Sequence, residues 1–186
     1  MLKIGQLTSI FGSLHCFPET IGKAAIAAND ITAFPSSDLN SPRPSYPTQN
    51  LIPFVTQTAA GIRKELSVFG DDYPTIDGTA VRDYIHVVDL AKAHIAALKR
   101  LINKTNKQNF EFFNVGSGKG SSVLEVIKAF EKASGQPLNY KIVGRREGDI
   151  TSAYANTTKA NKELNWKTEK SLNEGLASAW KWQQRQ

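Results

Sequence analysis

The sequence predicts an α/β fold, and three of its features support this prediction. From about residue 49 to the end, segments with the residue preferences of strands alternate with segments whose apolar residues recur at helical spacing. Of the 186 residues, 40% are hydrophobic, which is enough for one domain with a core. No segment repeats along the chain, so neither a solenoid nor a propeller is expected.

The first 48 residues contain few signals of regular structure. The segment 19–30 predicts a short helix, and the proline- and serine-rich segment 34–48 predicts irregular coil. Dense patterns begin only after this region, so we divide the chain into an unmatched part, 1–48, and a structured part, 49–186.

Between residues 50 and 79 we expect a helix, a strand and a loop. The helix covers 50–65 and has Pro53 in its first turn, where a missing N–H is tolerated. The strand covers 66–70, and the loop 71–79 consists of turn-forming residues.

A strand over 80–88 and a helix over 90–102 come next, and Asp89 between them can cap the helix. Arg82 and Asp83 are neighbours on this strand, so their side chains face opposite sides of the sheet. One of the two is expected to lie in a cleft.

The remainder of the chain continues the alternation. It predicts strands over 110–115 and 138–143 and helices over 122–134, 159–165 and 172–184.

A glycine-rich turn, 116–120, lies between a predicted strand and a predicted helix, as in phosphate-binding loops. A dinucleotide site needs a third glycine where Ser121 stands, and a nucleoside triphosphate site needs Ser or Thr directly after Lys119. Neither match is complete. The pattern favours a tight turn in which Ser121 or Ser122 caps the helix.

Composition narrows the class of partner and the compartment. The net charge of +6 is spread among carboxylates without an aromatic-rich basic run, so no nucleic acid is expected, and a small anionic ligand explains the charge equally well. A single cysteine, Cys16, excludes an internal disulfide, and no apolar run approaches membrane-spanning length. A cytoplasmic protein that does not enter a membrane is expected.

Three side chains have the composition of a metal site, namely His86, Asp89 and His94. Their spacing matches no recognised ligand pattern, and a strand end followed by a helix cap explains them better. No metal is expected.

The segment 144–149 carries Arg145, Arg146 and Asp149 on a glycine-bounded loop after a predicted strand. Such loops present ligand contacts in α/β folds. Arginine suits a phosphate, and aspartate accepts hydrogen bonds from ribose hydroxyls. The spacing alone fits a solvated basic loop equally well.

Several long stretches resemble the C-terminal half of UDP-glucose 4-epimerases, which are NAD-dependent extended short-chain dehydrogenases. They include "NLIPFVTQTAAGIRKELSVFGDDYPTIDGTAVRDYIHVVDLAKAHIAALKRL", "FFNVGSGKGSSVLEVIKAF", "RREGDI" and "KANKELNWKTEKSLNEGLASAWKWQ". The resemblance covers about 49–186, and its motifs occur in the family's order. It implies the UDP-sugar-binding portion of this fold, without most of the Rossmann domain.

The family interconverts UDP-galactose and UDP-glucose by passing a hydride through NAD, while a tyrosine assisted by a lysine four residues later moves a proton. No tyrosine of this chain has that lysine, and no Gly-x-x-Gly-x-x-Gly pattern is present. The resemblance therefore implies a form that is inactive alone, has no catalytic residue and binds no NAD. Intact relatives are expected to be homodimers in many cases.

The resemblance also implies which residues contact the UDP-sugar. Asn50, Leu51, Arg82 and Arg146 would contact the diphosphate, Asp149 the ribose, and Ser67, Val68 and Phe69 the uracil.

Ala153 would lie beside the C2 substituent of the sugar, where a small residue leaves room for an N-acetyl group. If Tyr154 lined the pocket instead, the expectation would reverse. An alternative function stays open as well, a non-catalytic nucleotide-binding or interaction module that uses the GSGKG turn with Arg145 and Arg146.

Overall fold

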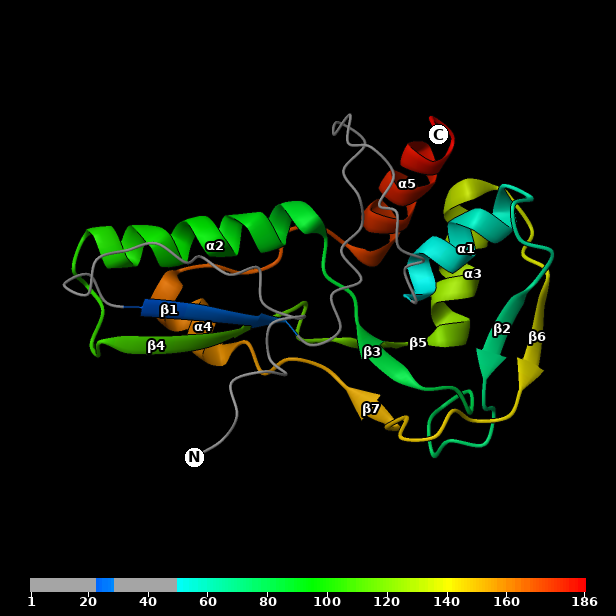
Figure 1. Ribbon diagram of the computed structural model, residues 1–186, viewed down its shortest axis with the longest axis horizontal. Helices are drawn as coiled ribbons and strands as arrows, with labels where there is room; N and C mark the ends of the chain where they lie inside the picture. Colours follow the sequence, from blue (N-terminus) through cyan, green and yellow to red (C-terminus); the bar gives the residue numbers. More distant parts are fainter. Residues whose placement is uncertain (1–22, 29–49) are drawn as a thin grey trace.

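The structure is a computed structural model that describes residues 23–28 and 50–186 (Figure 1). Its elements are, in chain order, β1 (Lys23–Ala28), α1 (Leu51–Ala59), β2 (Leu66–Phe69), β3 (Val81–Asp83), α2 (Val87–Ile102), β4 (Phe110–Val115), β5 (Gly120–Ser122), α3 (Val123–Ser134), β6 (Tyr140–Val143), β7 (Ser152–Ala153), α4 (Thr158–Leu164) and α5 (Leu172–Gln183). The predicted α/β class is confirmed.

The strands form three small sheets along an elongated molecule. β1 and β4 pair in parallel at one end, together with α2 and α4, and β2 and β6 pair in parallel at the other end, with α1, α3 and α5 (Figure 1). Between the two ends, β3 pairs with β5 in antiparallel and with β7 in parallel. The middle sheet therefore connects two halves.

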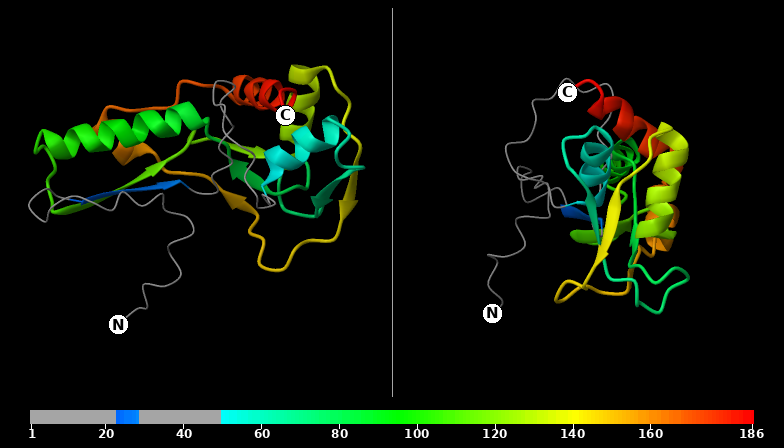
Figure 2. Two further views of the ribbon diagram at one scale, coloured as in Figure 1. Left: turned by 45° about the horizontal axis from the view of Figure 1, so that its top comes forward. Right: turned by 90° about the vertical axis from the view of Figure 1, so that its right-hand side faces the viewer.

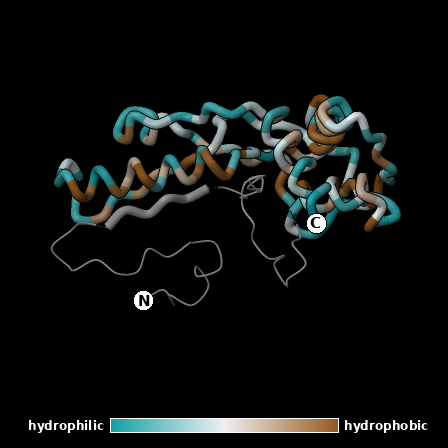
Figure 3. The backbone as a smooth tube through the Cα atoms, turned by 90° about the horizontal axis from the view of Figure 1, so that it is seen from above, coloured by the Kyte–Doolittle hydropathy of each residue, from teal (hydrophilic) through white to brown (hydrophobic). Residues whose placement is uncertain are grey.

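Each half has its own hydrophobic core. The first core joins α1, β2, α3 and α5 and includes Val55, Val68, Phe130 and Leu176. The second core joins α2, β4 and α4 around Phe113. Along α2, hydrophobic positions alternate with hydrophilic ones, as expected for a helix that covers a core on one side only (Figure 3). Within the described residues, no helix has the length and apolar character needed to cross a membrane.

Of the five helices in the described residues, α3 and α5 begin with a capping box. At α3 the Ser122 hydroxyl accepts from the Glu125 N–H, and the Glu125 carboxylate accepts from the Ser122 N–H, which forms the capping box. Of the two residues predicted to cap this helix, Ser121 and Ser122, the cap is therefore Ser122. At α2 the predicted cap was wrong. His86 caps the helix instead, because its Nδ1 accepts from the Val88 N–H at 3.1 Å.

Asp89 has a different structural role. Its buried carboxylate accepts from the N–H groups of Glu169 and Lys170, at 3.0 and 2.8 Å, and its backbone carbonyl accepts from the Trp166 indole. These bonds fasten the segment before α5 to the start of α2.

Other element boundaries also differ from the sequence predictions. The alanine-rich segment predicted as helix contains the strand β1 over 23–28, because pairing with β4 outweighs the helix propensity of alanine. The flanking residues of that predicted helix lie outside the described residues. α1 ends at Ala59, before Gly61 with its φ of +72°. The strand predicted over 80–88 is confined to β3.

One face of the β1–β4 pair is covered by α2 and α4, which both lie on the same side of it (Figure 2). The other face of β4 carries Phe110 and Phe112, which are 54% and 58% exposed. This half of the molecule thus presents aromatic side chains to solvent.

A group of ion pairs joins α2, β4 and α4, the elements around the second core. Arg100 of α2 donates from Nε to the Glu111 carboxylate at 2.7 Å and from Nη2 to that of Glu163 at 3.1 Å. The hydrogen bond from Arg100 lowers the pKa of the Glu111 carboxyl, against the opposite effect of burial, and the Lys107 N–H adds to the lowering. Glu111 also raises the pKa of Arg100.

The pKa of Glu111 is lower in the folded than in the unfolded chain, so its ionised carboxylate stabilises the fold at pH values above its ordinary pKa of 4.5. This stabilisation is lost as the pH falls through the pKa that Glu111 has in the folded chain. We expect Glu111→Gln to lower the free energy of unfolding by about 1–3 kcal/mol at neutral pH. The difference from the unmodified chain should shrink as the pH falls below 4.5, as urea titrations would measure.

Glu169→Gln is the matched control, because its ion pair with Lys92 is largely exposed and contributes little. Equal losses in both variants, or a loss for Glu111→Gln that does not depend on pH, would contradict the assignment.

Candidate functional site

Four of the predicted site residues meet beside the middle sheet. The Asp149 carboxylate accepts from Arg82 Nη2 at 2.9 Å through Oδ1, and from Arg146 Nε and Nη2 at 3.3 and 3.2 Å through Oδ2. The Arg146 guanidinium lies over the ring of Phe69, 4.7 Å from its centroid. We call Phe69, Arg82, Arg146 and Asp149 the arginine cluster.

The fold holds the two arginines to different degrees. Arg82 lies on β3 and also donates to the backbone carbonyls of Val81 and Ile150, and its side chain is only 13% exposed. Arg146 lies on the loop after β6 and is 52% exposed. One arginine is therefore fixed by the sheet, and the other can adjust to a ligand.

The arrangement suits an anion next to a flat ring. Two guanidinium groups share one carboxylate, so the cluster is positive overall and can donate to further acceptor oxygens with bidentate geometry. Phe69 projects away from the first core, since it alternates along β2 with the buried Val68. An aromatic ring in this position can stack on a planar base.

The other predicted contacts lie at the edges of this arrangement. Ser67 shares the outward face of β2 with Phe69, whereas the Val68 side chain is buried in the core and could offer only its backbone to a ligand. Asn50 occupies the N-cap position of α1, and Leu51 packs against the first core.

Strand register decides between Ala153 and Tyr154. Ala153 of β7 is the direct partner of Arg82 on β3, so both project from the same face of the middle sheet. Tyr154 projects from the opposite face, and a Cβ on Gly120 would lie only 3.2 Å from its ring. Ala153, and not Tyr154, shares a face with the arginine cluster.

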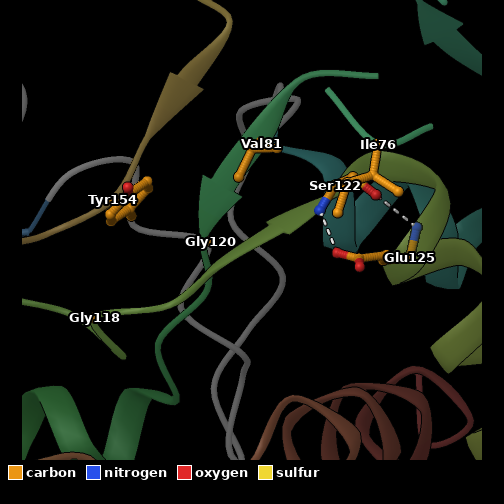
Figure 4. Close-up of a pocket in the computed structure, with 7 residues that line it drawn as sticks. All are labelled: Ile76, Val81, Gly118, Gly120, Ser122, Glu125 and Tyr154. Carbon is orange, nitrogen blue, oxygen red and sulfur yellow. Dashed lines mark hydrogen bonds between the residues drawn. The ribbon is translucent and has the colours of Figure 1, made fainter. Parts of the chain in front are cut away.

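The opposite face carries a pocket of about 400 Å³ (Figure 4). Its walls are formed by Ile76, Val81, Gly118, Gly120, Ser122, Glu125 and Tyr154. Next to it, burial acts to raise the pKa of Asp77, but hydrogen bonds from Ser122 and Thr79 outweigh this effect and lower the pKa. Ser122 and Glu125 are already engaged in the capping box, so the polar wall is largely used by the fold.

The glycine-rich turn does bind an anion, but that anion belongs to the chain. Asp83, which is 2% exposed, accepts through Oδ1 from the N–H and hydroxyl of Ser117, at 2.8 and 2.6 Å. Through Oδ2 it accepts from the N–H groups of Gly118 and Ala155, at 3.2 and 3.1 Å. The sequence pattern identified the turn as tight but did not identify Asp83 as its partner.

These contacts test whether the turn fits a dinucleotide such as NAD. The backbone N–H groups that would face a pyrophosphate already donate to the Asp83 carboxylate, and an added anion would meet its charge. The turn therefore does not fit NAD, and the same argument weighs against a nucleotide-binding module built on GSGKG.

The close fit around Gly116 leads to a stability prediction. A Cβ at this position would lie 2.3 Å from Asp83 Oδ2 and 2.8 Å from the Ala155 Cβ. We expect Gly116→Ala to lower the free energy of unfolding by about 1–3 kcal/mol, because the turn would have to move off the carboxylate.

The control is Gly144→Ala, where an added Cβ meets no heavy atom within 4 Å and the change should stay within about 0.5 kcal/mol. Thermal or urea unfolding of both variants gives the comparison. A harmless Gly116→Ala would mean that the turn does not depend on this contact.

Comparison with known proteins identifies the family. The family model described as GDP-mannose 4,6 dehydratase matches residues 27–179. A UDP-glucose 4-epimerase of Drosophila melanogaster is 42% identical over 190 aligned residues, which cover 96% of this chain and 54% of the relative. Both matches include residues before Gln49, of which the structure describes 23–28.

Solved structures give the same result. The UDP-glucose 4-epimerase of Stenotrophomonas maltophila, with bound NAD and formylated UDP-arabinopyranose, superposes with a TM-score of 0.81 at 42% identity over 87% of this chain and 47% of that one. The enzyme of Bifidobacterium longum, in complex with NAD+ and UDP, gives a TM-score of 0.78 at 45% identity over the same shares of the two chains.

The chain spans about half the length of the relatives that it matches. The matched part is the C-terminal part of the UDP-glucose 4-epimerases, as the sequence motifs predicted. By the family model and by these relatives, the chain belongs to the family of NAD-dependent nucleotide-sugar epimerases and dehydratases, and it aligns with the C-terminal part of UDP-glucose 4-epimerases.

Proposed function

We propose that this chain binds UDP-sugars as the substrate-binding half of a UDP-glucose 4-epimerase. The observation that supports this most directly is the arginine cluster, in which one carboxylate holds two guanidinium groups beside an aromatic ring. Related structures that carry UDP or a UDP-sugar together with NAD support the same class of ligand.

In this proposal each residue of the cluster contacts one part of the nucleotide. The diphosphate binds to Arg82 and replaces Asp149 as the partner of Arg146, because a diphosphate offers more charge to the mobile arginine than one carboxylate does. Asp149 then accepts from the ribose hydroxyls, and Phe69 packs on the uracil. Asn50 and Leu51 approach the diphosphate from the start of α1, and the segment of Ser67 and Val68 borders the base.

We also propose that the 186 residues alone do not interconvert UDP-galactose and UDP-glucose. Epimerisation needs a hydride acceptor and a proton-transfer tyrosine with its lysine, and the sequence has no Tyr-x-x-x-Lys pattern. In an intact epimerase, the other half of the enzyme would supply the NAD. Such a complete enzyme would act in galactose metabolism as a cytoplasmic homodimer.

The first test is a calorimetric titration with UDP. We expect binding by the unmodified chain and a loss of about tenfold or more in Arg146→Gln, because charge-assisted hydrogen bonds to the diphosphate disappear. The control is Arg145→Gln, because this neighbouring arginine is held by Asp72 and lies over the Tyr73 ring, outside the cluster. Its loss should change the affinity little.

Two further measurements separate the alternatives. Binding of NADP without binding of UDP would contradict the proposed function and favour a module built on the glycine turn. Turnover of UDP-galactose by the purified chain supplied with NAD would contradict the proposed inactivity, whatever the outcome of the UDP titration.

Ala153 leads to a prediction about the sugar. Since a small side chain shares the face of Arg82, UDP-N-acetylgalactosamine should bind about as well as UDP-galactose. Ala153→Tyr should weaken the N-acetylated ligand about tenfold more than UDP-galactose, because the ring fills the space that the acetamido group needs.

Ser152→Tyr is the matched control, because this residue pairs with Val81 and projects from the opposite face. Isothermal titration with the two nucleotide sugars measures both ratios. Equal effects of the two substitutions would place the sugar away from Ala153.

A further inference from the structure

The position of Ala153 beside Arg82 depends on a very short strand. β7 consists of Ser152 and Ala153 only, and its pairing with β3 involves just these two residues. A pair of this length has few ladder hydrogen bonds of its own, so other contacts must keep it in register.

One such contact lies at the start of β7. Arg82 donates to the Ile150 carbonyl at 2.9 Å and to the Asp149 carboxylate, and the Val81 N–H donates to the Thr151 carbonyl at 2.9 Å. These bonds attach the residues before β7 to β3. Since Arg82 and Asp149 both belong to the proposed UDP-sugar site, this attachment is expected to change when a ligand binds.

The other contact lies at the end of β7 and takes no part in the proposed ligand site. The Asp83 carboxylate accepts from the Ala155 N–H at 3.1 Å, while its remaining partners are Ser117 and Gly118 of the glycine turn. Both Asp83 and Ala155 are buried. The carboxylate thus joins β3, the turn and the residue that follows β7 at one point.

The register of β7 matters because Ala153 is small and its neighbour Tyr154 is bulky. Side chains alternate between the two faces of a strand, so a slip of β7 by one residue would bring Tyr154 to the face of Arg82 and move Ala153 away. Tyr154 is 56% exposed, so little packing holds its ring on the opposite face. The small residue stays beside the arginine cluster only while the end of β7 is held.

We propose that Asp83 is a positioning residue for sugar specificity: by holding the Ala155 N–H and the glycine turn, it fixes β7 in the register that places Ala153 beside Arg82. This inference rests on the proposed UDP-sugar function. It assigns to the glycine turn a role as the support of the carboxylate that sets the sugar pocket.

Asp83→Asn tests the proposal, because the amide is isosteric but has one acceptor oxygen where the carboxylate has two. In either orientation its NH2 group faces a backbone N–H, of Ser117 on one side or of Gly118 and Ala155 on the other. We expect the ratio of affinities for UDP-N-acetylgalactosamine and UDP-galactose to fall by about tenfold, since a bulky ring enters the pocket.

Ser117→Ala is the matched control. It removes the 2.6 Å hydrogen bond from the Ser117 hydroxyl to the same carboxylate and leaves the bond to Ala155 in place, so the affinity ratio should stay unchanged. Equal falls in both variants would mean that general loosening of the turn is responsible and would overturn the proposal. An unchanged ratio in Asp83→Asn would also overturn it.

A second readout needs no ligand. Hydrogen exchange of the Val81 N–H reports its bond to Thr151 and therefore the register of β7. Exchange should become faster in Asp83→Asn and in Ala155→Pro, which removes the N–H that donates to Asp83, but not in Ser117→Ala. Unchanged protection of Val81 in both of the first two variants would refute the positioning role.

The two readouts also separate this proposal from the proposed function. If the unmodified chain binds no UDP, the proposed function fails, while hydrogen exchange still decides whether Asp83 holds β7. If UDP binds and the exchange of Val81 is the same in all variants, only the positioning role fails.

Discussion

The buried carboxylate of Asp83 accepts four hydrogen bonds from two separate segments of the chain, and the middle of the molecule is arranged around it. A buried charge is costly unless each of its acceptor positions is used. Here the glycine turn supplies most of the donors, and the residue after β7 supplies the last. The carboxylate thus joins three segments of the chain, between two halves that have separate cores.

The adjacent residue on β3 shows how the same strand contributes to the proposed ligand site. Arg82 follows Val81 and precedes Asp83, so its guanidinium lies on the face opposite the Asp83 carboxylate. One residue of this strand therefore holds the scaffold, and its neighbour faces the ligand. Such adjacency explains why the two faces of a small sheet can differ so strongly in chemistry: one carries the arginine cluster, and the other carries the pocket beside Tyr154.

The glycine turn resembles a phosphate-binding loop in sequence, but the anion that it binds is a carboxylate of the same chain. Closely spaced glycines expose backbone N–H groups that favour an anion, whatever its source. In this chain the anion is a side chain from a strand more than thirty residues earlier, as the separation of 34 residues between Asp83 and Ser117 shows. The partial match to a nucleotide-binding motif therefore reflects the preference of these backbone N–H groups for an anion, which here stabilises the fold.

The two faces of the β1–β4 pair differ in their chemistry. The part of the chain that the structure describes presents Phe110 and Phe112 on the uncovered face of β4. In the same half, the Arg100, Glu111 and Glu163 ion pairs join α2, β4 and α4 without help from further elements. Packing and charge pairing thus hold the face of β4 that α2 and α4 cover, and the opposite face carries the exposed aromatic side chains.

Local sequence alone determined the elements whose signals lie within one segment. The helix α3 could be predicted with a cap at Ser121 or Ser122, because capping and apolar spacing depend on residues a few positions apart. The family motifs likewise predicted Arg82, Arg146, Asp149 and Phe69 as ligand contacts, and these four residues lie together in the fold. Tertiary structure decided what depends on distant partners: the strand β1 in an alanine-rich segment, the role of Asp83, and the placement of Ala153 rather than Tyr154 beside Arg82. These features arise from strand pairing and buried hydrogen bonds between residues far apart in the chain, which no local pattern encodes.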